Sequence, residues 1–226
     1  MIHRTSACLA LCLVALVGSA TAQGAPVRYP PARDAFSFFP SGVFHRARPD
    51  LDTFQLSWYG GALLALHEPP LYGARPAAGM TVLRFLWLRS FHPEVAVRVE
   101  SGPDRCRVVT TVLGRRPDPA VVGRSGSVPM EFRFAPVARR DSSDLPGRSC
   151  EPVLRRLRDA QFWSAHVTDS AQGVDGAEWV LEGVSSTLYH VLTRWAPDRA
   201  GARPVRAAGL AFLLLGHAAP SPREIY

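Results

Sequence analysis

The chain has 226 residues, 47% of them hydrophobic and 20% charged. This composition excludes disordered and collagen-like proteins and suits one domain with a substantial core. All 26 basic residues are arginine, and the formal net charge is +7. Because the arginines are spread along the whole chain, the charge indicates a basic solvated surface and does not favour nucleic-acid binding.

Residues 1–22 have the pattern of a secretory signal peptide. Arg4 gives a positive start, the apolar run 7–17 follows, and Ala20-Thr21-Ala22 supplies the small residues of a cleavage site. The apolar run is about half the length that spans a bilayer, so a retained membrane anchor is the weaker interpretation. We therefore expect cleavage after Ala22, a periplasmic or secreted protein, and no membrane span after cleavage.

Cleavage at that point would leave two cysteines, Cys106 and Cys150. In an oxidising compartment they have one intramolecular pairing, so we expect a disulfide that closes a loop of about 45 residues. The alternative is a reactive or metal-binding thiol pair, but neither cysteine has a CxxC partner or a histidine at ligand spacing. The sequence predicts no metal site and no cofactor.

Residues 23–50 form a Pro-rich N-terminal arm without regular periodicity. The cluster Phe36-Ser37-Phe38-Phe39 is too apolar for a free linker, so we expect part of the arm to pack on the domain. The domain itself is expected over residues 51–217, and residues 218–226 form a C-terminal tail.

The central part of the chain predicts an antiparallel meander. Residues 81–91 are a nearly continuous apolar run, typical of a central strand covered on both faces. Residues 94–100 alternate, with Val95, Val97 and Val99 inward, and residues 105–113 form a third strand after a turn. The Arg-, Pro- and Ser-rich segment 114–148 is expected to be a loop that holds a short strand at 130–134.

Two helices and a hairpin are predicted after this loop. Ser149 is the expected N-cap of a helix over residues 150–162, whose arginines face outward. Residues 177–183 and 187–195 are expected to pair as a hairpin, and residues 205–215 form a buried helix. The predicted fold class is therefore α+β, a single domain with a mainly antiparallel sheet of five or more strands covered by two or three helices.

Three segments carry a resemblance to a known group of proteins. They are the Phe162-Trp163 pair, residues 173–183 with the pattern GxDGxxWxxEG, and residues 189–197 with the pattern YHxxxRWxP. Together with residues 68–71 and 84–92, they resemble a family of uncharacterised exported bacterial proteins. The resemblance implies a shared fold over roughly residues 55–216 and names no activity.

The predicted hairpin carries most of the candidate functional residues. If the apolar side chains of both strands face the core, the two residue numbers of each cross-strand pair must add up to an even value near 370. That register places Glu178, Glu182, His190 and Arg194 together on the opposite face. The carboxylates and the imidazole are candidate acid/base groups, and Arg194 is a candidate anion ligand. Ordinary cross-strand pairing on a sheet face is the alternative interpretation.

Arg89 and His92 form a second candidate ligand-binding locus, because His92 precedes Pro93 at an expected strand end. Trp87, Trp163 and Trp179, like Trp195, could line a sugar-binding platform, although their positions favour core packing.

The sequence contains no specific catalytic motif. We therefore expect an exported, non-enzymatic binding protein of the cell envelope, whose partner is a protein or an anionic envelope component. The alternative is a small hydrolase of envelope material that uses Glu178, Glu182 or His190.

Overall fold

The computed structural model describes residues 27–115, 121–122, 131–171, 173, 175–198 and 200–219. The expected signal peptide and most of the expected C-terminal tail lie outside these ranges. Among the described residues, no helix combines the length and the apolar character that crossing a membrane requires.

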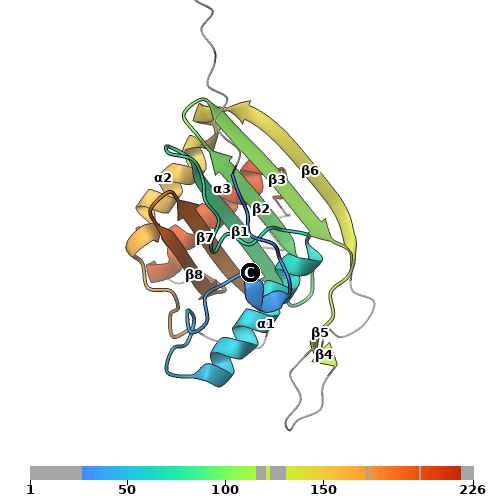
Figure 1. The fold of residues 1–226 in the computed structure, drawn as a ribbon. Coiled ribbons are helices and arrows are strands. Elements are labelled where there is room, and N and C mark those ends of the chain that lie inside the picture. The colour runs from blue at the N-terminus through green and yellow to red at the C-terminus, as the bar shows by residue number, and fades with distance from the viewer. Residues whose placement is uncertain are drawn as a thin grey trace, which may run out of the picture.

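Six antiparallel strands form the main sheet, in the order β6-β3-β2-β1-β7-β8 (Figure 1). The strands are β1 (Thr81–Arg89), β2 (Val95–Ser101), β3 (Arg105–Leu113), β6 (Val137–Pro146), β7 (Ala177–Ser185) and β8 (Tyr189–Trp195). A separate two-stranded ribbon consists of β4 (Val121–Val122) and β5 (Glu131–Phe132). The helices are α1 (Pro49–Ala65), α2 (Glu151–Asp159) and α3 (Arg203–Leu215), with short 3₁₀ turns η1 (Ala35–Ser37), η2 (Gly147–Cys150), η3 (Phe162–Ser164) and η4 (Ala200–Ala202). The α+β prediction is confirmed.

Helices cover both faces of this sheet. On one face α2 and α3 pack over a core that includes Phe85, Trp87 and Trp179. On the other face α1 and the N-terminal arm pack over Leu86 and Val180. Figure 1 shows α1 in front of the sheet and α2 and α3 behind it. Because both faces are buried, β1 needs apolar side chains at consecutive positions, as its continuous apolar run predicted.

The N-terminal arm packs on the domain, as its aromatic cluster predicted. Phe38 and Phe39 are buried, whereas Phe36 is 51% exposed. The chain then turns back along the sheet, and the buried Asp52 carboxylate accepts backbone N–H bonds from Gly42 at 2.7 Å and Phe44 at 2.9 Å. These bonds fix the turn that leads into α1.

Helix α1 itself was not predicted. Its first residue, Pro49, suits the first turn of a helix, and Asp50 and Asp52 lie in that turn, where carboxylates are favoured. Apolar residues occur around most of the helix, so the sequence lacks the one-sided periodicity that identifies a surface helix.

The prediction of a loop over residues 114–148 is wrong for its last third. Residues 137–146 form β6, which pairs with β3 at the edge of the sheet. Nearly all β6 side chains are exposed, so this strand carries no hydrophobic alternation. Two residues of the expected strand at 130–134 form β5.

The helix expected at 150–162 is shorter than predicted. Cys150, which makes no side-chain capping bond, precedes α2 in place of the expected cap Ser149. The arginines of α2 face outward as predicted. The disulfide prediction is also confirmed: Cys106 and Cys150 are bonded and fully buried, and they join β3 to the start of α2.

Candidate functional site

The hairpin register differs from the predicted one. Glu178 pairs with Trp195 and Val184 pairs with Tyr189, so paired numbers sum to an odd value. The Ser185 N–H donates to the Leu188 carbonyl at 2.8 Å, which closes a loop of one residue fewer than expected. A change of one residue transfers every side chain of one strand to the other face. The four candidate side chains therefore do not share a face: Glu178 and Glu182 lie on the α1 face, and His190 and Arg194 lie on the other.

Glu182 is part of a buried ion pair. It is 2% exposed, it pairs with the Arg84 guanidinium, and it accepts a hydrogen bond from the Tyr189 hydroxyl at 3.0 Å. Arg84 also donates to the Pro69 carbonyl at 2.7 Å. Burial raises the pKa of Glu182, while the charge of Arg84 and hydrogen bonds from Arg84 and Tyr189 oppose the rise. This carboxylate stabilises the fold and lines no part of the cleft described below.

His190 and Arg194 have structural contacts on the other face. The His190 ring packs edge-on against Phe162 with ring centroids 5.2 Å apart, and burial lowers the pKa of its imidazole. The Arg194 guanidinium donates to the carbonyls of Thr193 at 2.7 Å, His166 at 2.9 Å and Val167 at 3.2 Å. It thereby holds the segment before β7 against β8, and its Nε atom lies 3.7 Å from the Asp169 carboxylate, so the guanidinium is already paired within the protein.

The second predicted locus is also structural. Arg89 is buried, its guanidinium lies 4.1 Å from the centroid of the Trp87 ring, and it donates to the Pro93 carbonyl at 2.6 Å. Neither Arg89 nor the half-buried His92 lines the cleft.

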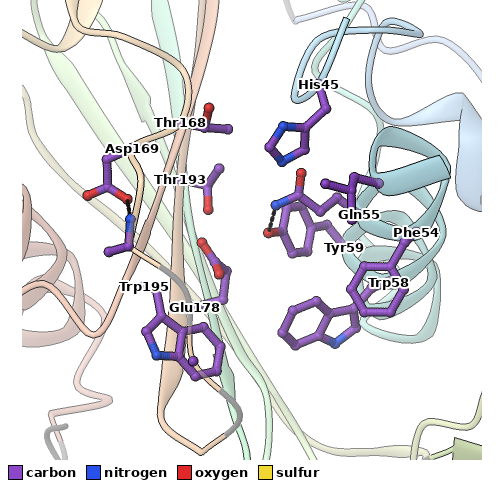
Figure 2. A pocket seen from close by; sticks show the side chains of 13 residues that line it. His45, Phe54, Gln55, Trp58, Tyr59, Thr168, Asp169, Glu178, Thr193 and Trp195 are labelled. Carbon is purple, nitrogen blue, oxygen red and sulfur yellow. Dashed lines mark hydrogen bonds between the residues drawn. The ribbon is translucent and has the colours of Figure 1, made fainter. Parts of the chain in front are cut away.

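A cleft of about 200 Å³ lies between the first half of α1 and the ends of β7 and β8. Figure 2 shows its two sides: Gln55, Trp58 and Tyr59 come from α1, and Glu178 and Thr193 come from the hairpin. At the rim lie side chains from two connecting segments, namely His45, Thr168 and Asp169. Of the residues proposed from the sequence, this cleft contains only Glu178 and Trp195.

A short chain of polar groups crosses the cleft floor. The Gln55 side-chain amide donates to the Tyr59 hydroxyl at 2.8 Å, and Tyr59 faces the carboxyl of Glu178. Gln55 and Tyr59 are four residues apart, so both side chains lie on one face of α1. Tyr59 is fully buried and Glu178 is 6% exposed. The polar groups are therefore held in place by the surrounding core.

The Glu178 carboxyl has a raised pKa, which favours its protonated form at neutral pH. Burial and the negative charge of Asp169 raise the pKa of Glu178 to about 8, although hydrogen bonding by Tyr59 and the charge of Arg194 oppose the rise. A neutral carboxyl carries a proton that it can donate, whereas a carboxylate only accepts hydrogen bonds. Burial also raises the pKa of Tyr59, so the phenol stays neutral over the same pH range.

Two polar atoms in the cleft wall lack hydrogen bonds of ordinary geometry. The Gln55 Oε1 atom is buried and has no such partner among the described residues, and Thr193 Oγ1 makes a contact with the Tyr59 hydroxyl that falls outside this geometry. Most buried polar atoms in folded proteins are paired, so each exception needs an explanation. Both atoms belong to residues that line the cleft, so rotation of either side chain would turn its oxygen toward a bound molecule.

Aromatic rings form the remaining walls. Trp58 and Trp195 lie on opposite sides of the lower part of the cleft in Figure 2, with Phe54 beside Trp58. Trp195 is held by the glycines of the GxDG segment: a Cβ atom at Gly173 would lie 2.2 Å from Trp195 Nε1. Only glycine permits this close approach, so the segment positions the Trp195 indole as a wall of the cleft.

The α1 side of this site was not predicted from the sequence. Gln55, Trp58 and Tyr59 could be recognised only after residues 49–65 were assigned to a helix, which brings these positions to one surface. The described residues contain no group of three or more histidine, cysteine or acidic side chains that could hold a metal ion.

The sequence matches no protein-family model, and no curated protein matches it significantly. The resemblance to exported bacterial proteins therefore stays an expectation, and the function must be inferred from the cleft.

Proposed function

We propose that this protein binds a small, uncharged, hydroxyl-rich ring, such as a single sugar unit, in the cleft between α1 and the β7–β8 hairpin. One arrangement carries this proposal: the cleft that contains the buried Gln55 amide and the protonated Glu178 carboxyl is also lined by the Trp58 and Trp195 indoles. Binding sites for small molecules typically combine apolar and aromatic walls with a few placed polar groups. On the pattern of residues 1–22, we further propose that the protein acts in the periplasm or outside the cell.

The polar groups of the cleft suit hydroxyl groups. A hydroxyl both donates and accepts, so it can donate to Gln55 Oε1 and accept from the neutral carboxyl of Glu178. The Trp58 and Trp195 indoles offer flat apolar faces to the carbon-bound hydrogens of a ring. Among the described residues that line the cleft none is an arginine, and nearby Arg194 is already paired with the Asp169 carboxylate at 3.7 Å. An anionic ligand is therefore disfavoured here.

Binding should depend on the protonation of Glu178. We expect constant affinity for a neutral sugar below about pH 7 and a loss of roughly tenfold per pH unit above the Glu178 pKa of about 8. The reason is that ionised Glu178 loses the proton it donates and places a charge in the cleft. Tryptophan fluorescence and calorimetry with glucose, galactose, mannose and N-acetylglucosamine at millimolar concentration would measure this profile.

Glu178→Gln is the matched variant, because the amide has the same shape, stays neutral and still donates. It should bind at neutral pH and lose the pH dependence. His45→Gln is the control for a side chain that lies at the rim and does not belong to the chain of polar groups across the cleft floor. If none of the neutral sugars binds, or if Trp58→Ala leaves binding unchanged, the proposed site is wrong.

Hydrolysis of the bound ligand is a second candidate function. It is favoured because two carboxyl groups in different environments line one cleft: the buried Glu178, whose pKa is raised, and the partly exposed Asp169, which lies beside Arg194. For an acetal bond, Glu178 would protonate the leaving oxygen while water attacks the carbon and Asp169 takes a proton from that water. We expect turnover of aryl glycosides that both Glu178→Gln and Asp169→Asn abolish. Sugar binding without any turnover by the wild-type protein would exclude this second function and leave the first intact.

A further inference from the structure

We propose that the physiological ligand is a neutral oligosaccharide that extends from the cleft across α1 into a second hollow on the same helix. This inference rests on the proposed function, because the cleft would hold one sugar unit of the chain. The second hollow would hold a following unit.

The second hollow shares a wall with the cleft. It has a volume of about 460 Å³ and lies between the first turns of α1, the arm and β5. Phe54 lines both the cleft and the hollow, and Phe36 and Phe132 also line the hollow. A ligand that leaves the cleft past Phe54 therefore enters the second hollow directly.

Aromatic side chains are continuous from one site to the other. The Phe54 ring centroid lies 5.8 Å from that of Trp58 and 5.5 Å from that of Phe132. Trp58 and Phe132 are stacked at 6.1 Å with an interplanar angle of 17°. Phe36 is 51% exposed at the edge of the hollow. Contiguous aromatic surfaces that remain partly exposed in a soluble protein often mark ligand-binding grooves.

Charge and polarity distinguish between the polymers that stack on aromatic rings. Single-stranded nucleic acids also stack on such rings, but their sites have basic side chains along the phosphate path. The described residues that line the two hollows include no arginine, and their two carboxylates are already paired with arginines outside the lining: Asp50 with Arg48 at 3.3 Å and Asp169 with Arg194 at 3.7 Å. The lining therefore offers a phosphate-bearing chain no unpaired cation, whereas a neutral sugar chain can use the Asp50 and Ser57 oxygens as hydrogen-bond partners.

Calorimetry with neutral oligosaccharides of one to six units tests this inference, using malto-, cello- and chito-oligosaccharides and the full chain. In the series that binds, affinity should rise with length until both hollows are filled and then stay constant. Phe36→Ala should weaken binding of the longer oligosaccharides by about three- to tenfold and leave monosaccharide binding unchanged. Phe91→Ala is the matched control, because Phe91 is 66% exposed and lines neither hollow.

Each alternative outcome is informative. Monosaccharide binding without any gain from longer chains, or with no effect of Phe36→Ala, would overturn the extended site and leave the proposed function in place. Failure of all sugars together with binding of a dT oligonucleotide or an unstructured peptide would overturn both. Because Phe36 is half exposed, its replacement should not alter thermal unfolding, which separates a binding defect from a folding defect.

Discussion

Replacing Arg84 with alanine is expected to lower the free energy of unfolding by about 3–5 kcal/mol. Arg84 and Glu182 are 1% and 2% exposed and pair across β1 and β7. Removing the guanidinium would leave the buried carboxylate with Tyr189 as its remaining hydrogen-bond partner. An uncompensated buried charge is among the most destabilising consequences of a single substitution.

The effect should extend beyond one pair because the ion pairs are linked. Glu68, which follows α1, lies 3.8 Å from Arg84 and 2.9 Å from Arg98. Arg98 in turn pairs with Glu100 and donates to the Tyr29 hydroxyl at 3.0 Å. Arg140 of β6 also lies 3.7 Å from Glu68, so the ion pairs connect the arm, the segment after α1 and the four strands β1, β2, β6 and β7. Loss of Arg84 would weaken the contact of α1 with the sheet as well as the pair itself.

Urea unfolding followed by circular dichroism would measure the loss. Arg105→Ala is the matched control, because Arg105 and Asp144 form an ion pair between half-exposed side chains, and such pairs contribute at most about 1 kcal/mol. The double variant Arg84→Met with Glu182→Leu should be more stable than Arg84→Ala, since it leaves no charge unpaired at this position. If Arg84→Ala were no more destabilising than Arg105→Ala, a buried ionic network would be the wrong description.

Sequence patterns alone could not predict this network. Arg84 occurs inside an apolar run, and its partner Glu182 is 98 residues away. The apolar run at residues 81–91 correctly predicted a strand buried on both faces. Strand β7 is buried on both faces as well, so its sequence does not indicate which of its side chains face α1. When apolar residues face both sides, hydrophobicity does not distinguish an even from an odd pairing, and the loop length decides. Glu182 and His190 were assigned to one face for this reason.

The candidate site was predictable on one side only. Glu178 and Trp195 lie on strands that the sequence identified, and the glycines that hold Trp195 belong to a recognisable motif. Tyr59 and Trp58 come from α1, which shows no one-sided apolar pattern because α1 contacts the sheet, the arm and β5 at once. The polar strand β6 was missed for the opposite reason, since most of its side chains contact solvent.

The disulfide shows how covalent chemistry can be predicted where packing cannot. Two cysteines allow only one pairing, and the bond between Cys106 and Cys150 is present. Its closed loop of about 45 residues corresponds to about 4 kcal/mol in the chain-entropy model. Replacing both cysteines with alanine should therefore lower the free energy of unfolding by about that amount and Tm by roughly 8–16 °C.

Binding and stability should separate in this variant. The disulfide lies in the core on the α2–α3 face of the sheet, and the cleft lies on the α1 face. The double variant should consequently bind a neutral sugar as the wild-type protein does at temperatures below its lowered Tm. Differential scanning calorimetry and fluorescence titration measure the two quantities on the same sample.

Reduction of the wild-type protein should reproduce the loss in Tm, because the covalent bond and not the packing of the sulfur atoms is responsible for the effect. Two alkylatable thiols at Cys106 and Cys150 in unreduced protein would contradict the expected bond, and an unchanged Tm would contradict its contribution to stability.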